Sequence, residues 1–307
     1  MHTLWICLFI VLGMLAAVFG LGCLLAAISM RIQRQSLQEA WSWQAAHYDL
    51  SWYGPLEKED YQVKSYDGYV LHVELLRNPK PTDRYVLISH GYTDNRYGAL
   101  KYAKNYLDFG FHVLIYDLRG HGENEKTFCT YSVREGRDLD ALVRDSRARY
   151  PDARLFGLHG ESLGAATSIA SLKYDPPVDF VVSDCGFSEI KSVLQVGMRA
   201  MHLPAGLVNL ASPCAKLLYG CSYRQMRPIE SLHGTKLPIL FLHGAKDDFI
   251  LPAHAEAMHR AAADHSELHL IPEAPHAISC LTDPPLYRRY QEDFLARHHF
   301  LNEKMKL

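Results

Sequence analysis

Ser162 lies in a pattern of residues that is typical of a nucleophilic serine. Glycines flank it in the run Gly160-Glu-Ser-Leu-Gly164, which joins an apolar stretch ending at His159 to a helix-forming stretch. A turn from strand to helix is sharp and crowded at this point, so glycines are needed beside the serine, whose Oγ atom is then held above the edge of a sheet. The pattern predicts a nucleophile elbow that attacks carbonyl carbon atoms.

A serine nucleophile needs a base that accepts its proton and a carboxylate that orients the base. Asp247 and His276 follow Ser162 in this order, each just after a predicted buried strand. Asp248 is an alternative acid, because its spacing to the following proline fits the usual loop better, and Asp184 is a rival after an earlier strand. We expect Ser162, His276 and Asp247 to form a catalytic triad.

Acyl transfer also needs N–H groups that stabilise the oxyanion. The backbone N–H of Leu163 is one candidate, because it directly follows the serine and begins a helix. The second is the backbone N–H of Tyr92, in the turn that leaves the strand Tyr85 to Ser89, where Gly91 allows close approach. Both groups are predicted to face the Oγ atom of Ser162.

The elements that must position these residues are predicted from apolar runs that alternate with helical patterns. A hairpin turns at Asp67-Gly68. Strands and helices then alternate. Strands are predicted at 85–89, 112–116, 155–159, 180–183, 239–243 and 267–270, and helices at 99–108, 134–150, 162–174, 253–263 and 285–298. This succession predicts an α/β fold with a mostly parallel sheet, helices on both faces and a leading antiparallel hairpin. Residues 186–236 interrupt the alternation and are interpreted as an irregular lid.

An apolar segment from Leu4 to Met30 is long enough to span a bilayer. It lacks a preceding Lys or Arg and exceeds a signal h-region, so we interpret residues 1–30 as a retained transmembrane anchor. Residues 31–56 are expected to form a juxtamembrane linker, and residues 57–307 the enzymatic domain. Arg31 and Arg34 after the span favour a cytoplasmic domain by the positive-inside rule.

Composition excludes several other classes of protein. The net charge of −2 offers no electrostatic footprint for nucleic acid. Five cysteines follow the apolar segment without a paired CxxC spacing, which argues against a metal site. They are expected to be buried free thiols, with a Cys214–Cys221 disulfide as the alternative.

Five motifs resemble those of α/β-hydrolase-fold serine hydrolases, and the resemblance covers about residues 57–300. They are Ser89-His-Gly-Tyr-Thr-Asp-Asn95, Tyr116-Asp-Leu-Arg-Gly-His-Gly122, His159-Gly-Glu-Ser-Leu-Gly-Ala-Ala-Thr167, Ser183-Asp-Cys-Gly-Phe187 and Leu242-His-Gly-Ala-Lys-Asp247. The resemblance extends to bacterial membrane-anchored or exported members of uncertain substrate. It implies the α/β-hydrolase fold, a serine mechanism without a cofactor and an extracytoplasmic domain. We expect a carboxylesterase or lipase-like enzyme acting on a small-molecule or lipid ester. An acyltransferase or thioesterase with the same triad, or an inactive binding protein, are the alternatives.

Overall fold

The computed structural model describes residues 1–301 and is organised around one eight-stranded sheet. The strand order is β1-β2-β4-β3-β5-β6-β7-β8. β1 and β2 form the antiparallel hairpin and β2 also runs antiparallel to β4, whereas all the other neighbours are parallel. The strands are β1 Lys58–Lys64, β2 Val70–Leu76, β3 Arg84–Ser89, β4 His112–Tyr116, β5 Leu155–Glu161, β6 Phe180–Asp184, β7 Ile239–Gly244 and β8 Ser266–Ile271.

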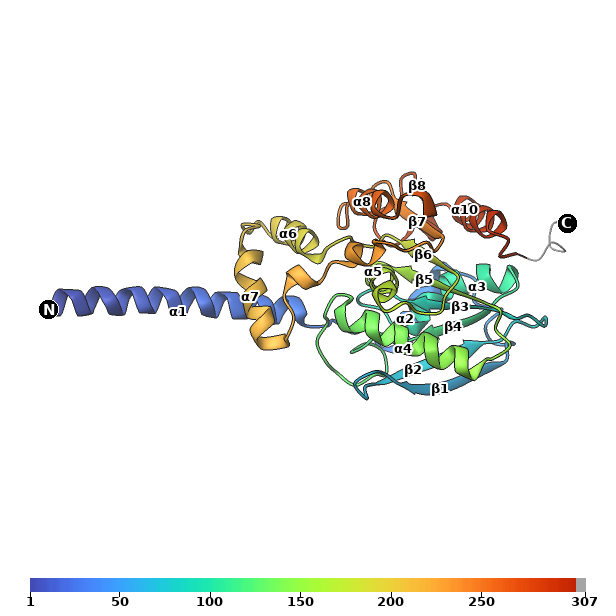
Figure 1. The fold of residues 1–307 in the computed structure, drawn as a ribbon, viewed down its shortest axis with the longest axis horizontal. Helices are drawn as coiled ribbons and strands as arrows, with labels where there is room; N and C mark the ends of the chain where they lie inside the picture. Colours follow the sequence, from blue (N-terminus) through green and yellow to red (C-terminus); the bar gives the residue numbers. More distant parts are fainter. Residues whose placement is uncertain (302–307) are drawn as a thin grey trace.

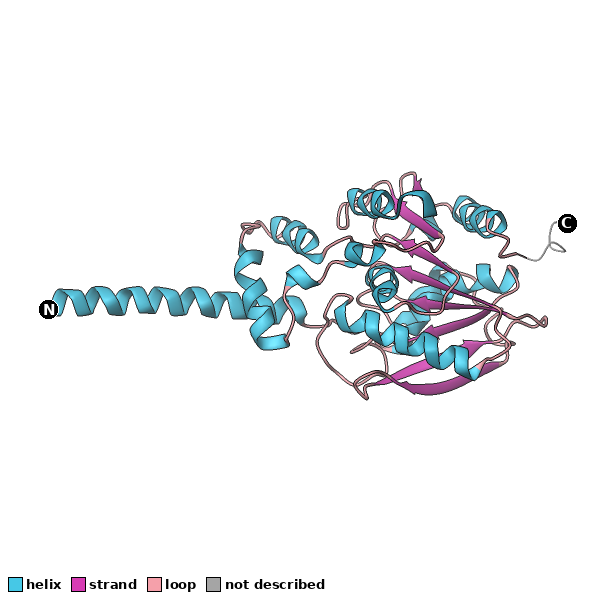
Figure 2. Ribbon diagram, viewed as in Figure 1, coloured by secondary structure: helices cyan, strands magenta, loops and turns pink. Residues whose placement is uncertain are grey.

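Helices cover both faces of this sheet (Figures 1 and 2). One face packs against α4, α5 and α8, and the other against α2, α3 and α10. The helices are α1 His2–Met30, α2 Leu37–His47, α3 Leu100–Asp108, α4 Val133–Arg149, α5 Leu163–Ser171, α6 Ile190–Ala200, α7 Leu207–Tyr219, α8 Ala253–Ala262, α9 Ser279–Thr282 and α10 Pro284–Arg297. The predicted fold class is therefore confirmed, and the predicted strands and helices lie within a few residues of the observed ones.

The segment 186–236 differs from the expectation, because it is largely helical. It contains α6 and α7 and two short 3₁₀ helices, Tyr223–Gln225 and Pro228–Leu232. Pro213 lies inside α7, although proline removes one backbone donor from a helix. The helix forms nevertheless, because its apolar face, which includes Val208 and Ala211, is buried against the rest of the protein.

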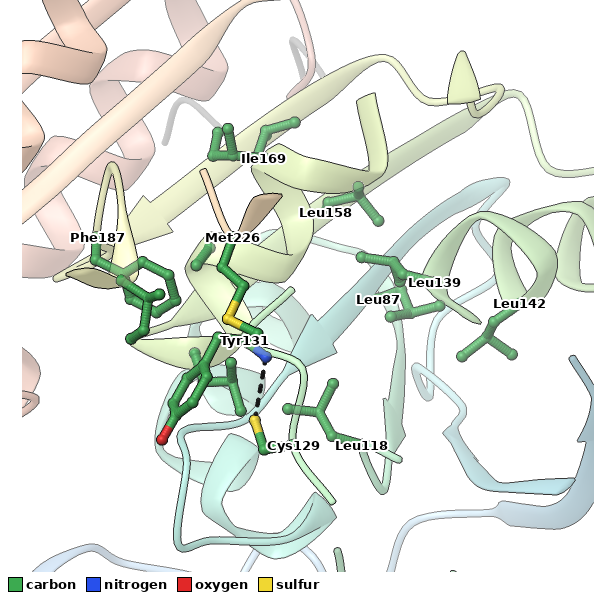
Figure 3. Close-up of a cluster of buried hydrophobic side chains, with 14 of the residues drawn as sticks. Leu87, Leu118, Cys129, Tyr131, Leu139, Leu142, Leu158, Ile169, Phe187 and Met226 are labelled. Atoms are coloured by element: carbon green, nitrogen blue, oxygen red, sulfur yellow. Dashed lines mark hydrogen bonds between the residues drawn. The ribbon is translucent and has the colours of Figure 1, made fainter. Parts of the chain in front are cut away.

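The hydrophobic core between the sheet and the helices α4 and α5 extends to Phe187, in the segment that follows β6 (Figure 3). Leu139 and Leu142 of α4 meet Leu87 and Leu158 of the sheet in this cluster. Figure 3 shows Tyr131 near Cys129, whose Sγ atom accepts a hydrogen bond from the Tyr131 backbone N–H at 3.3 Å. The loop before α4 is therefore part of the core.

The last turns of α1 pack against the domain, while its first turns project outward (Figure 1). Gly22, Ala26 and Met30 are buried, and α1 contacts α7. A Cβ atom at Gly22 would lie 2.8 Å from both Leu210 O and Cys214 Sγ, so the backbones of the two helices approach closely there. This helix is long and apolar enough to cross a membrane.

Residues 31–56 lie against the domain and contain α2. Ser36 begins α2 with a capping box, in which its side chain accepts from Glu39 N–H and Glu39 accepts from Ser36 N–H. Trp41 of this helix packs with the cluster on the α3 side of the sheet. The division of the chain into anchor, linker and domain stays a prediction.

Candidate active site

The strand β5 ends in a tight turn that places Ser162 at the start of α5. Ser162 has φ of 52° and ψ of −110°, a conformation that is strained for any residue except glycine. Cβ atoms at the flanking glycines would clash, since one at Gly160 would lie 2.3 Å from Gly164 O and one at Gly164 would lie 2.1 Å from Ser89 O. The glycines are therefore required by space, and the geometry is that of a nucleophile elbow.

A continuous line of hydrogen bonds joins the three residues that the sequence singled out. Ser162 Oγ lies 3.0 Å from His276 Nε2, and His276 Nδ1 lies 2.7 Å from Asp247 Oδ2. Asp248 is exposed. Asp184 instead accepts a hydrogen bond from Tyr287 at 3.0 Å and is fully buried. Of the three carboxylates considered, only Asp247 contacts the imidazole of His276.

Asp247 is held by four donors. Besides His276, these are the backbone N–H groups of Phe249 at 3.1 Å and Ile250 at 2.8 Å, and His243. The Nε2–H group of His243 is shared between Ile250 O at 2.7 Å and Asp247 Oδ2 at 3.2 Å. Burial opposes ionisation of Asp247, but the hydrogen bonds from His243 and His276 outweigh it and hold its pKa well below the usual range.

Sequence reasoning missed the role of His243. This residue lies within the apolar strand β7 and its side chain has no exposed surface, so its pattern is that of a core residue. The spacing of four residues to Asp247 across the strand end was the available signal. His243 contacts the carboxylate of Asp247 and not Ser162, so any effect on the serine would act through Asp247.

The residues that carry the two predicted oxyanion donors line the same cavity as Ser162. Leu163 begins α5, where the first N–H groups of a helix have no acceptor within the helix. Tyr92 follows Gly91, at which an added Cβ would lie 3.9 Å from Ser162 Cβ. His90 holds this loop, because its Nδ1–H donates to Gly91 O at 2.7 Å and its Nε2 accepts from Leu118 N–H at 2.9 Å.

The hydrogen bonds of His90 also define its ionisation state. One nitrogen donates and the other accepts, which is the pattern of a neutral imidazole. Burial lowers its pKa well below the usual value, with the neighbouring His121 acting in the same direction. His90 is therefore a fixed, uncharged support of the loop that carries Tyr92.

Behind the serine lies a buried ionic cluster. Glu161 forms an ion pair with Lys101, and the Tyr102 hydroxyl lies 2.5 Å from Glu161 Oε2 and 3.0 Å from Asp184 Oδ2. Lys101 Nζ also donates to Ala277 O at 3.3 Å. Because Ala277 follows His276, this lysine links the serine turn to the loop that carries the imidazole.

An apolar cavity of about 300 Å³ opens directly onto Ser162 and Leu163. We call it the apolar cavity; its other lining residues are Leu25, Ile28, Ser29, Tyr92, Tyr131, Phe187, Ile190, Val193, Leu194, Gly197, Met198, Met201, Leu203, Phe249 and Ile250. None of these lining residues, all within the described part of the chain, carries a charge. The cavity therefore suits an uncharged, apolar group bound beside the serine.

The cysteines are all free thiols in the described residues. Cys214 and Cys221 do not form the disulfide that was the alternative expectation, and both are buried. Cys214 instead lies against Gly22 of α1. Its thiol therefore contributes to the packing between α1 and α7.

Comparison with known proteins gives matches of three kinds. Residues 80–203 match the model of a family described as serine aminopeptidase, S33. The uncharacterised protein YqkD of Bacillus subtilis is 31% identical over 247 residues, which cover 78% of this chain and 80% of the relative. An uncharacterised membrane protein of Saccharomyces cerevisiae is 24% identical, with 64% of each chain covered.

Solved structures show the same fold. An esterase of Pyrococcus furiosus superposes with a TM-score of 0.67 at 24% identity, covering 79% of this chain and 91% of the esterase. A thermophilic esterase from Thermogutta terrifontis superposes with a TM-score of 0.56 at 17% identity, covering 78% and 99% of the two chains.

Proposed function

Because the chain belongs to the α/β-hydrolase family, we propose that it is a membrane-bound serine hydrolase that cleaves carboxylic esters. One observation carries this proposal: the unbroken line of hydrogen bonds from Ser162 through His276 to Asp247, on a strained elbow. A serine in this arrangement is activated by the imidazole, and the carboxylate fixes the tautomer of the imidazole.

The reaction has two halves. Ser162 Oγ attacks the ester carbonyl while His276 Nε2 accepts the hydroxyl proton, and the tetrahedral oxyanion receives hydrogen bonds from the N–H groups of Leu163 and Tyr92. His276 then gives the proton to the leaving alcohol, and the C–O bond to the alcohol breaks. Water, deprotonated by His276, then attacks the acyl-serine. The bond between the acyl carbon and Ser162 Oγ breaks and His276 returns its proton to Oγ, which releases the carboxylic acid and restores the serine hydroxyl.

The lining of the apolar cavity favours an ester over a peptide with a free amino terminus. An ammonium group that is taken out of water needs a carboxylate or another compensating partner, because burial of an unpaired charge is costly. The cavity lining contains no Asp or Glu. An uncharged acyl group fits this lining without such a cost.

Anchoring in the membrane is part of the proposal. The outer turns of α1 are apolar and exposed, whereas Ala26 and Met30 near its end are buried in the domain. Cleavage of the segment as a signal would remove these buried side chains, so its packing supports retention. The side of the membrane on which the domain lies stays a prediction, and a reporter fused after Leu307 would identify it.

Labelling by a fluorophosphonate tests the proposal. We expect the wild-type protein in detergent to be labelled and the Ser162→Ala variant not to be, while Ser51→Ala, which changes an exposed serine outside the site, is labelled normally. The thermal unfolding of all three proteins should be similar. Labelling that persisted in folded Ser162→Ala would contradict the assignment.

A further inference from the structure

The mouth of the apolar cavity is lined by exposed apolar side chains. Ile28 is 62% exposed, Met201 59%, Phe249 47% and Leu203 41%, and all four line the cavity that leads to Ser162. Large apolar side chains that gather on an exposed rim mark a surface that contacts a membrane or another apolar partner. The entrance to the site is therefore as apolar as its interior.

The wall on one side of the cavity is α1 itself. Leu25 and Ile28 are three residues apart, so they lie on the same face of the helix, and both line the cavity. The end of α1 is held in place through its carbonyl oxygens: the Tyr131 hydroxyl donates to Ser29 O, and Cys129 N–H donates to Met30 O at 2.9 Å.

Two side chains of the active site take part in holding this helix. Tyr92, whose backbone N–H is a proposed oxyanion donor, donates its hydroxyl to Arg31 O. Its ring stacks on that of Tyr131, with ring centroids 5.9 Å apart. The end of α1 and the loop that carries Tyr92 are therefore packed together. α1 thus forms part of the site in addition to being the proposed membrane anchor.

The length of α1 places this entrance close to a bilayer. At about 1.5 Å per residue, the exposed turns His2 to Leu21 extend about 30 Å, which is the thickness of the hydrocarbon core. From Leu21 to Ile28 the helix rises only about 10 Å further. Figure 1 shows α6 and α7 grouped around the point where α1 meets the domain.

We propose that the apolar cavity binds the acyl chain of a lipid ester that enters directly from the adjacent bilayer leaflet, with Leu25 and Ile28 of α1 determining the chain preference. This inference rests on the proposed esterase function and adds its substrate class. The ester group would lie at Ser162, and the acyl chain would lie between α1, α6 and the residues around Phe249.

Polar substitutions in α1 test the role of the helix wall. Leu25→Gln and Ile28→Gln are compared with Leu24→Gln, whose side chain is exposed on the same helix and does not line the cavity. The measurement is kcat/KM for p-nitrophenyl acetate and p-nitrophenyl dodecanoate, using the full-length protein in detergent micelles. We expect the ratio of dodecanoate to acetate kcat/KM to fall about tenfold in the two cavity variants and to stay unchanged in Leu24→Gln.

Several outcomes would overturn the role of α1. Equal loss of both activities in the cavity variants would point to general damage, and an equal effect of Leu24→Gln would point to the apolarity of the helix as a whole. Fluorophosphonate labelling of each variant reports whether Ser162 remains reactive. If the wild-type protein is labelled but shows no preference for the longer ester, this inference fails while the proposed esterase function stands; if neither ester is cleaved, the proposed function itself fails.

A second experiment tests the route of the substrate. The protein is reconstituted into phosphatidylcholine vesicles, and a fluorogenic long-chain glycerol ester is placed either in the same vesicles or in separate ones. We expect hydrolysis at least tenfold faster when enzyme and ester share a bilayer. Equal rates in the two arrangements would show delivery through water and would overturn entry from the leaflet.

Discussion

His243 Nε2 lies 3.2 Å from Asp247 Oδ2. His243 is near the end of β7, and Asp247 lies in the turn that follows this strand. The carboxylate that orients His276 is therefore itself positioned by a second imidazole, which is fully buried in the sheet. Because the same Nε2–H also donates to Ile250 O, His243 sets the shape of the whole loop that carries the acid.

Replacing His243 by leucine should lower kcat without removing the triad. Loss of the Nε2–H donor leaves Asp247 and Ile250 O with one fewer hydrogen bond, so the imidazole of His276 is less well oriented. We expect kcat for a p-nitrophenyl ester to fall about tenfold with KM little changed. His243→Gln keeps a donor and should restore most of the activity; an equal loss in both variants would argue for packing alone.

Asp247 and Asp248 offer a matched pair of substitutions. Asp247→Asn should lower kcat by about 10³ to 10⁴, because the amide no longer fixes the correct tautomer of the base. Asp248→Asn changes an exposed neighbour and should alter kcat less than twofold. Steady-state kinetics with one ester would decide between them, and a larger effect at Asp248 would transfer the role of the acid to that residue.

Asp184 should make stability depend on pH. Burial, and after it the charge of Glu161, raises its pKa from 3.8 to about 6. Between these values the folded protein binds more protons than the unfolded chain, so the free energy of unfolding falls as the pH rises, by at most about 3 kcal/mol. Relative to wild type, Asp184→Asn should therefore gain stability from pH 4 to pH 6.5 in unfolding measurements in detergent. Parallel profiles would contradict the raised pKa.

Gly22 should be intolerant of a side chain. A Cβ atom there meets Leu210 O and Cys214 Sγ of α7 at 2.8 Å, whereas one at Gly20 meets no atom within 4 Å. We expect Gly22→Leu to separate α1 from α7, to lower the free energy of unfolding by about 1–3 kcal/mol and to expose the lid, residues 186–236, to proteolysis. Gly20→Leu, two residues away, should leave both properties unchanged. Similar protease resistance of the two variants would speak against close packing of the helices.

Sheet and elbow were predictable because their signals are local. Glycine and proline punctuate the apolar runs, and Gly160 and Gly164 leave room for backbone atoms that no other residue allows. The same logic misjudged the lid, since Pro213 indicates a break when the surrounding segment is considered alone. Burial of the apolar face of α7 overrides that local preference.

The parts of the site that sequence reasoning missed depend on contacts between distant residues. His243 has the pattern of a core residue until the chain folds back to place Asp247 beside it. The apolar segment before Arg31 has the composition of a membrane span. This composition gives no sign that its last turns pack against α7 and line the apolar cavity. The spacing of four between Gly22, Ala26 and Met30, small or flexible residues on one face, was the only signal of packing against α7.

The continuity of α1 has a mechanical consequence. A single helix runs from His2 to Met30, and its far end is clamped by the tyrosines beside the serine. Because the helix is unbroken between its outer turns and its clamped end, the proposed membrane segment is joined to the domain without a hinge. With α1 in the bilayer, as proposed, a change in bilayer thickness would tilt the helix to match the hydrocarbon. The sheet would lean with it, so the thickness of the membrane would set the height of Ser162 above the lipids.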